Sequence, residues 1–278
     1  EFEEILAKTE TGQQKKSKLF PVLQYAASIV LICSAALGWY AYQRNQVKPA
    51  EDIEMLSRTT HPGEKVKLIL SDSTVVYLSG SSTLEWPSRF VKGRNRNIRL
   101  NGEGFFEVKR DTLSPFIVHS GKIQTRVLGT SFNISAYPTD HIFSVAVRTG
   151  KVRVSEIKKG VLIKLSLLTR GMKLDYNIQN QRYLVSTVKV EEINSWTANR
   201  FIFKDANLLT LLGKLERYYN VRFELKSPCL ANSRQFNATF NQKSIKDVME
   251  QVRMMSGGNI HYKIRTNSLI TVWGEGCK

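Results

Sequence analysis

An uncharged stretch near the start of the chain, VLQYAASIVLICSAALGWYAY, constrains its topology more than any other feature. It runs for 21 residues, from Val22 to Tyr42, with aromatic residues near both ends. At about 1.5 Å per residue, a helix of this length crosses the ~30 Å hydrocarbon core of a bilayer, and aromatic residues favour its interfaces. A secretory signal would have a shorter apolar region, and a buried core helix would seldom run this long without a charge. We therefore predict a transmembrane helix over residues 19–42.

The charges beside this stretch predict its orientation. The basic run KKSK, Lys15–Lys18, adjoins the first end, and Arg44 follows the other end. Because lysine and arginine beside a span favour the cytoplasmic side, we expect the N-terminus inside and residues 43–278 on the far side of the membrane. The first residue is Glu1 rather than Met, so we interpret residues 1–18 as the remnant of a longer cytoplasmic region.

The net charge of +17 falls entirely on residues 43–278, because residues 1–18 carry four basic and four acidic residues and the predicted span carries none. Such a charge can attract nucleic acid. However, the sequence has no Lys/Arg run, zinc-finger spacing or aromatic RNA-binding motif in this region. We therefore favour a basic surface that faces anionic lipid, cell wall or an acidic partner over direct nucleic-acid binding.

Beyond a polar linker at residues 43–60, residues 61–187 are a series of short runs that are typical of strands. Examples are KVKLIL, TVVYLS, NIRL, GFFEVKR, FIVHS and VLIKLSL, which alternate in polarity or are rich in β-branched and aromatic residues. Turn signals separate the runs at residues 71–73, 100–104, 148–151, 158–160 and 169–171. This pattern predicts an all-β domain with a solenoid-like or sandwich-like stack of strands.

Residues 199–274 have a different pattern, in which two amphipathic helices alternate with strands. One helix places leucines and a tyrosine on one face, and the other does the same with Ile, Val and Met: Leu208, Leu211, Leu212, Leu215, Tyr219; Ile245, Val248, Met249, Val252, Met255. Ser244 and Asp247 resemble a capping box before the second helix. The order β-α-β, β-α-β, β predicts a small α+β domain with a βαβ repeat, whose apolar stripes are helix core.

Several segments of the chain together resemble the FecR family of transmembrane anti-sigma regulators. They are PGEKVKLILSDSTVVYLSGSSTLEWPSRF, RNIRLNGEGFFEVKRD, PFIVHSGKIQTRVLGTSFNISAY and FSVAVRTGKVRVSE. The last domain resembles the C-terminal module of the same proteins, which is similar to the secretin and TonB short N-terminal domain. The resemblance covers about residues 60–275. One departure is Ser73, where the family usually has a glycine that would accept a positive φ more easily.

The resemblance implies a signalling bridge across the inner membrane. Members of the family hold an extracytoplasmic-function sigma factor through cytoplasmic N-terminal helices. Their periplasmic part contacts the signalling domain of a TonB-dependent outer-membrane receptor, which here implies residues 199–274. Most of the anti-sigma region would be missing from residues 1–18, so no sigma-contacting residue is assigned. The resemblance implies no enzyme activity, no cofactor and no direct contact with nucleic acid.

The resemblance also singles out the Gly129–Thr130 bond, because some members of the family are cleaved at such a bond without a protease. The threonine hydroxyl would attack the preceding carbonyl, which requires a strained peptide and an aligned hydroxyl. The alternative is that Gly129 makes a bulge and Thr130 begins a strand. We favour this alternative for the present chain.

Other residues that could carry chemistry have plainer interpretations. Glu103 and Glu107 would lie about 13 Å apart on one face of a strand, which exceeds the ~5–9.5 Å of glycosidase carboxylates. We therefore expect Glu103 in the turn at 100–104 and Glu107 on a solvated face. The four histidines lack metal-ligand spacing and are expected to be ordinary surface or half-buried residues: His61, His119, His141 and His261.

The sequence does not determine the redox state of the three cysteines. Cys33 lies in the predicted span, and Cys229 and Cys277 either form one disulfide or stay free.

An open strand edge of the small domain could accept a partner strand, and RQFNATF at residues 234–240 is a candidate edge. The alternative is that the β domain covers this edge. Two other functions stay open. One is an envelope-anchored protein that binds peptidoglycan or acidic glycan without sigma control. The other is an envelope enzyme, which the lack of a nucleophile–base pair or metal cluster disfavours.

Overall fold

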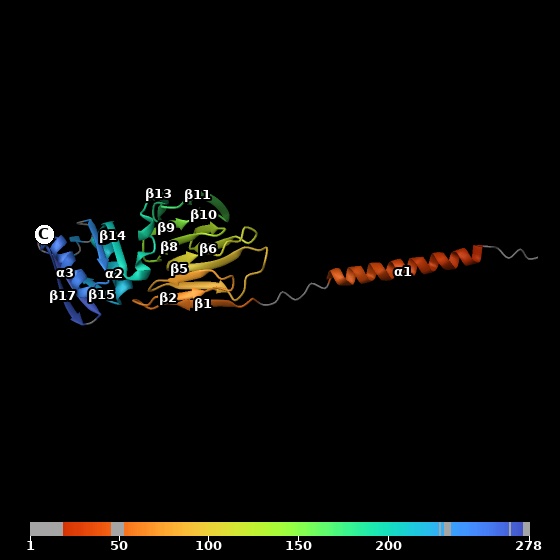
Figure 1. Ribbon diagram of the computed structural model, residues 1–278, viewed down its shortest axis with the longest axis horizontal. Coiled ribbons are helices and arrows are strands. Elements are labelled where there is room, and N and C mark those ends of the chain that lie inside the picture. The colour runs from red at the N-terminus through yellow and green to blue at the C-terminus, as the bar shows by residue number, and fades with distance from the viewer. Residues whose placement is uncertain (1–18, 46–52, 228, 231–234, 267, 275–278) are drawn as a thin grey trace, which may run out of the picture. The chain divides into compact units, whose positions relative to one another are not determined.

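The computed structural model describes residues 19–45, 53–227, 229–230, 235–266 and 268–274 (Figure 1). The chain divides into two compact units, Glu1–Asp52 and Ile53–Lys278. In the first unit, helix α1 spans Leu19–Asn45, and its described side chains at residues 29–42 are exposed. The described part of the chain holds no helix that is both long and apolar enough to cross a membrane. The predicted cytoplasmic region at residues 1–18 lies outside the described residues.

The first part of the second unit consists of strands joined by short turns. The strands are β1 (Met55–Thr59), β2 (Val66–Ile69), β3 (Val75–Leu78), β4 (Thr83–Pro87), β5 (Arg96–Glu107), β6 (Phe116–Ser120), β7 (Ile123–Val127), β8 (Ser131–Ala136), β9 (Ile142–Thr149), β10 (Lys151–Lys158), β11 (Val161–Thr169), β12 (Met172–Asn177) and β13 (Arg182–Thr187). Residues 55–59, at the end of the predicted linker, thus form a strand, which pairs with β4.

Strand β5 belongs to two sheets at once. Its first half pairs with β4 and, in parallel, with β6, whereas its second half pairs with β3 and β8. One sheet therefore has the order β11-β10-β7-β6-β5-β4-β1, and the other has the order β2-β3-β5-β8-β9-β12-β13. Buried residues of both sheets form a single hydrophobic cluster, so the domain is sandwich-like rather than a solenoid.

The turn predicted at residues 100–104 is wrong, because residues 96–107 form one continuous strand. Gly102 has a φ of +111°, and a Cβ at this position would lie only 2.6 Å from Cα of Ser82. Glycine therefore lets β5 bend past Ser82 as it passes from one sheet to the other. Asparagine and glycine give the same local signal for such a bend as for a turn.

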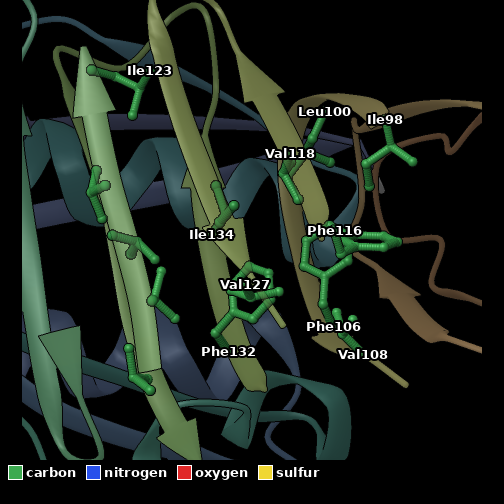
Figure 2. Packing of buried hydrophobic residues seen from close by; sticks show 14 of the residues in the cluster. Ile98, Leu100, Phe106, Val108, Phe116, Val118, Ile123, Val127, Phe132 and Ile134 are labelled. Carbon is green, nitrogen blue, oxygen red and sulfur yellow. The ribbon is translucent and has the colours of Figure 1, made fainter. Parts of the chain in front are cut away.

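The core of the sandwich is built around aromatic side chains where β5 changes sheets (Figure 2). Phe106 stacks on Phe132 with 5.2 Å between the ring centroids, and its ring lies 6.4 Å from that of Phe116. All three side chains are completely buried. They bring together β5, β8 and β6, so both sheets contribute to one aromatic contact.

The turn between β2 and β3 keeps a left-handed residue although it lacks glycine. Ser73 has a φ of +66°, and the backbone N–H of Ser73 donates to the carbonyl of Leu70 at 2.9 Å. The carboxylate of Asp72 accepts a hydrogen bond from the backbone N–H of Thr74 at 3.0 Å. This side-chain contact stabilises a turn that serine alone would favour less.

The C-terminal module, residues 199–274, has the predicted order of elements. After the short helices η1 (Val190–Glu192) and η2 (Ser195–Ala198), it comprises β14 (Arg200–Ala206), α2 (Leu208–Tyr219), β15 (Arg222–Leu225), β16 (Phe236–Asn241), α3 (Ile245–Met255), β17 (Ile260–Thr266) and β18 (Leu269–Gly274). Strand β14 pairs with β16, and β18 lies between β15 and β17. Each repeat thus contributes its first strand to one small sheet and its second strand to the other.

Both helices of the module begin at side-chain caps. Asn207 accepts a hydrogen bond from the N–H of Thr210 before α2, and Ser244 accepts one from the N–H of Asp247 before α3. The predicted leucine stripe of α2 is buried at Leu208, Leu211, Leu212 and Leu215. These side chains belong to a second hydrophobic cluster, which α3 and the two small sheets complete.

Candidate functional site

Two neighbouring phenylalanines of β5 point into different cores. Phe106 belongs to the core of the sandwich, whereas Phe105 belongs to the cluster formed by the C-terminal module. Both side chains are completely buried. The outer face of the sheet that contains β5, β8 and β9 is therefore covered by the module. We call this contact the seam. Its polar side chains belong to Lys65, Glu103, Asn133, Tyr137, Asp140, Trp196, Arg217 and Tyr218, and Gly80 contributes a close backbone approach.

Glu103 is the centre of the seam, which overturns its expected place in a turn. Only 7% of this residue is exposed. Its carboxylate accepts hydrogen bonds from Asn133 Nδ2 at 3.0 Å and from the hydroxyl of Tyr218 at 3.1 Å. Asn133 Oδ1 in turn accepts a hydrogen bond from Trp196 Nε1 at 2.9 Å. The network joins β5 and β8 of the sandwich to η2 and α2.

Burial and the Glu103 carboxylate shift the pKa values of the lysines and tyrosines around it. Burial lowers the pKa of Lys65, and the Glu103 carboxylate acts in the opposite direction. The same two effects act on the pKa of Lys214. Burial and then the Glu103 carboxylate raise the pKa of Tyr218 and of Tyr137, so both phenols are held protonated. Lys65 also donates to the carbonyl of Trp196 at 2.7 Å, which crosses the seam.

Arg217 forms a second group of contacts across the seam. Its guanidinium makes a bidentate ion pair with Asp140 at 3.1 and 2.9 Å and lies 4.0 Å from the ring centroid of Tyr137. The backbone carbonyl of Arg217 accepts a hydrogen bond from the N–H of Gly63 at 2.8 Å. A Cβ at Gly80 would overlap this carbonyl oxygen. The seam thus requires glycine at this position for a direct approach between backbones.

These contacts fit mechanical coupling better than catalysis. The carboxylate is occupied by two hydrogen-bond donors, and the nearby guanidinium of Arg217 is paired with Asp140. Such a buried and satisfied network fixes one arrangement of two packed parts. A force or a partner that acts on the C-terminal module would therefore act on the sandwich as well.

Replacing Trp196 with phenylalanine is expected to lower the free energy of unfolding by about 1–2 kcal/mol. The variant keeps most of the ring but leaves the buried Asn133 Oδ1 without its donor. Chemical unfolding of residues 53–278 measures the loss. The matched control is Trp86→Phe on β4, a half-buried residue outside the seam. An equal loss in both variants would contradict the role of the hydrogen bond.

The Gly129–Thr130 bond lies between β7 and β8, where the chain passes from one sheet to the other. Gly129 has a φ of +149°, and a Cβ there would lie 2.6 Å from Cα of Arg110. Thr130 is buried, and its hydroxyl donates to the carbonyl of Lys151 at 3.1 Å. The structure thus places a positive-φ glycine beside a buried hydroxyl that bonds another strand.

We expect residues 53–278 to stay intact at this bond during prolonged incubation. Water needed to hydrolyse an ester has little access to Thr130, and its hydroxyl is engaged with Lys151. Denaturing gels and intact-mass measurement test this expectation, with Thr130→Val as the variant that cannot form the ester. A break after Gly129 in the parent chain that is absent from this variant would contradict it.

The remaining predicted residues do not gather into a chemical site. Glu107 lies at the far end of β5, opposite Val75. Within the described residues, no group of three or more His, Cys, Asp or Glu side chains is placed to hold a metal ion. Cys33 is free and exposed, Cys229 is disulfide-bonded, and Cys277 lies outside the described residues.

The histidines have separate environments. His119 Nε2 lies 3.1 Å from Asn97 Oδ1, and burial lowers the pKa of its imidazole. His261 stacks on Trp273 with 5.8 Å between ring centroids. His61 donates a backbone hydrogen bond to Glu64 at 2.8 Å.

Residues 236–240 of the candidate edge lie in β16, and residue 234 lies outside the described residues. Phe236 and Phe240 point into the core of the module, and β14 is the partner of β16 among the described strands. The other edge of β16 therefore has no strand partner in the part of the chain that the structure describes.

The seam was not predicted from the sequence, although α2 carries a signal for it. Tyr218 follows Leu215 and Leu211 at helical spacing, so a polar hydroxyl falls on the buried stripe. A buried tyrosine usually finds a hydrogen-bond partner. The partners themselves come from distant segments and have no local signature.

Comparisons with known proteins agree with this architecture. The family model described as FecR protein matches residues 57–153, and the one described as FecR, C-terminal, matches residues 200–271. Together the matches cover more than half of the chain, and the chain belongs to the FecR family.

Two crystal structures of a candidate anti-sigma factor from Parabacteroides distasonis are similar to this chain. They have TM-scores of 0.73 and 0.72 and are 26% and 27% identical to it; in each case the match covers 80% of this chain and 100% of the solved chain. A comparison with curated proteins finds no significant match. The family is regulatory rather than enzymatic, and these matches support a role for this chain in the regulation of sigma factors.

Proposed function

We propose that the protein is a single-pass inner-membrane sigma regulator that relays a signal from a TonB-dependent outer-membrane receptor to an extracytoplasmic-function sigma factor. Residues 19–42 anchor it, residues 1–18 belong to the cytoplasmic side, and residues 53–278 work in the periplasm. The proposal rests on the two FecR matches, on the similar anti-sigma factor structures, and on the uncharged stretch in the sequence.

The buried seam is the observation that supports the proposed passage of a signal from the C-terminal module to the sandwich. A receptor domain that binds residues 199–274 meets a module fixed to the sandwich through Phe105, Glu103 and Arg217. The sandwich begins at β1, close in sequence to the proposed span. A partner that binds the module would therefore also act on the sandwich, because the seam fixes the two to each other.

Site-specific photo-crosslinking in the native cell tests the receptor contact. A photoreactive residue replaces Thr239, which is exposed on β16 at the edge without a described partner. The control places the same residue at Thr112, an exposed position on the sandwich. We expect a TonB-dependent receptor to be crosslinked from position 239 and not from position 112. Equal yields at both positions, or capture of peptidoglycan alone, would favour the envelope-binding alternative.

A further inference from the structure

The sandwich is open along the side where its two sheets end in β11 and β13. Among the described strands, β11 pairs with β10 and β13 pairs with β12, so one edge of each lacks a strand partner. Lys158 Nζ donates to Gln181 Oε1 at 3.3 Å, and the hydroxyl of Tyr176 donates to Glu156 Oε1 at 2.9 Å. These two contacts bring the ends of the sheets together, and Figure 1 shows β11 and β13 at the same side.

Inward-facing apolar side chains remain exposed along this side. Ile163 is opposite Glu156, which turns inward to Tyr176, and Tyr183 is opposite Tyr176 on the other sheet. Val161 lies two residues before Ile163 and therefore shares its face. Val161, Ile163 and Tyr183 are 62%, 43% and 47% exposed.

Inward positions on the neighbouring inner strands β10 and β12 are covered. Val154 lies on β10, which pairs with β11, and Leu174 lies on β12, which pairs with β13. Both side chains are completely buried. The apolar interior is therefore accessible to solvent at Val161, Ile163 and Tyr183, near the edges of β11 and β13.

The open side is also basic. Residues 151–187 contain eight basic and two acidic residues. Both acidic side chains are already engaged, because Glu156 accepts from Tyr176 and Asp175 pairs with Lys173 at 2.8 Å. The exposed basic residues nearest the edge are Lys158, Lys159, Lys164 and Arg182. They would attract an acidic partner and repel a basic one.

We propose that β11 accepts an added strand from a partner protein, in the form of an extended segment that alternates acidic and apolar residues. The free backbone groups of β11 would bond the segment, its apolar side chains would cover Val161, Ile163 and Tyr183, and its carboxylates would meet the lysines. This edge lies in residues 154–199, between the two regions that the family models match. It is separate from the module proposed to contact the receptor.

The probe is a synthetic octapeptide that alternates glutamate and valine, titrated into residues 53–278. This part folds on its own, since it is one compact unit and the similar crystal structures consist of the matching part alone. We expect saturable binding and slower amide hydrogen exchange in β11. A lysine–valine peptide of the same pattern should not bind, and N-methylation of alternate residues in the glutamate peptide should weaken binding at least tenfold.

The deciding variant is Ile163→Glu, which places a carboxylate at the edge. It should weaken binding of the glutamate peptide at least tenfold. The matched control is Ile69→Glu on β2, an edge strand at the opposite side where Ile69 is 71% exposed. This control should bind as the parent does, and circular dichroism confirms that both variants fold.

Three results would overturn the proposal. The first is no saturable binding of the glutamate peptide at millimolar concentration, or equal binding of the lysine peptide. The second is a concentration-dependent dimer that Ile163→Glu abolishes, which would make a second copy of this chain the occupant. The third is binding to vesicles of anionic lipid that the same variant abolishes, which would make a membrane surface the occupant. None of these results bears on the crosslink from position 239.

Discussion

Replacing Phe106 with alanine is expected to lower the free energy of unfolding of residues 53–278 by about 3–5 kcal/mol. The ring is completely buried and contacts Phe132 and Phe116, so its removal leaves a cavity where β5 passes between the two sheets. Domains of this kind are stable by only about 5–15 kcal/mol, so the variant loses a large share of the total.

Urea unfolding followed by tryptophan fluorescence measures this loss. The control is Leu113→Ala, since Leu113 is 76% exposed and its removal should change stability by less than about 0.5 kcal/mol. A loss below about 1 kcal/mol for the Phe106 variant would mean that the two sheets do not share a core at this position.

Introducing a methyl group at Gly80 is expected to open the seam. In Gly80→Ala the new Cβ would overlap the backbone carbonyl oxygen of Arg217. This oxygen also accepts the hydrogen bond from the N–H of Gly63, so moving either backbone aside would break that hydrogen bond. We expect a loss of about 3 kcal/mol, at the upper end for overpacking, and separate unfolding of the C-terminal module before the sandwich.

Calorimetry tests this prediction because it separates one cooperative transition from two. The matched control is Gly213→Ala in α2, where the nearest atom to a new Cβ is the tip of the Arg217 side chain at 3.9 Å. Alanine there should stabilise the helix by up to about 1 kcal/mol. A single unshifted transition in the Gly80 variant would contradict tight coupling across the seam.

Local patterns in the sequence were sufficient to predict the order of helices and strands in the C-terminal module. The apolar stripes of α2 and α3 and the cap at Ser244 depend on residues that are close in the chain, so the order of elements could be derived from spacing alone. The pairing of the strands could not. Placing β14 beside β16, and β15 and β17 on either side of β18, depends on contacts between distant segments.

In the sandwich and the seam, contacts between distant segments determine even more of what the sequence did not predict. The segment LNGEG carries turn residues, yet β5 continues through it because Gly102 lets the strand bend past Ser82. Burial of Glu103 depends on donors from Asn133 and Tyr218, which are 30 and 115 residues away in the sequence. A charged residue beside glycines therefore suggested a turn, although three-dimensional packing makes Glu103 the centre of a buried network.

Capture of a sigma factor from the native membrane would test the proposed regulation of a sigma factor by this protein. The full-length protein as the cell makes it is crosslinked, isolated through a tag at its C-terminal end, and its partners are identified by mass spectrometry. A variant that keeps residues 19–278 alone serves as the control. We expect an extracytoplasmic-function sigma factor with the full-length protein and its loss from the control. An intact full-length protein that captures no sigma factor would contradict it.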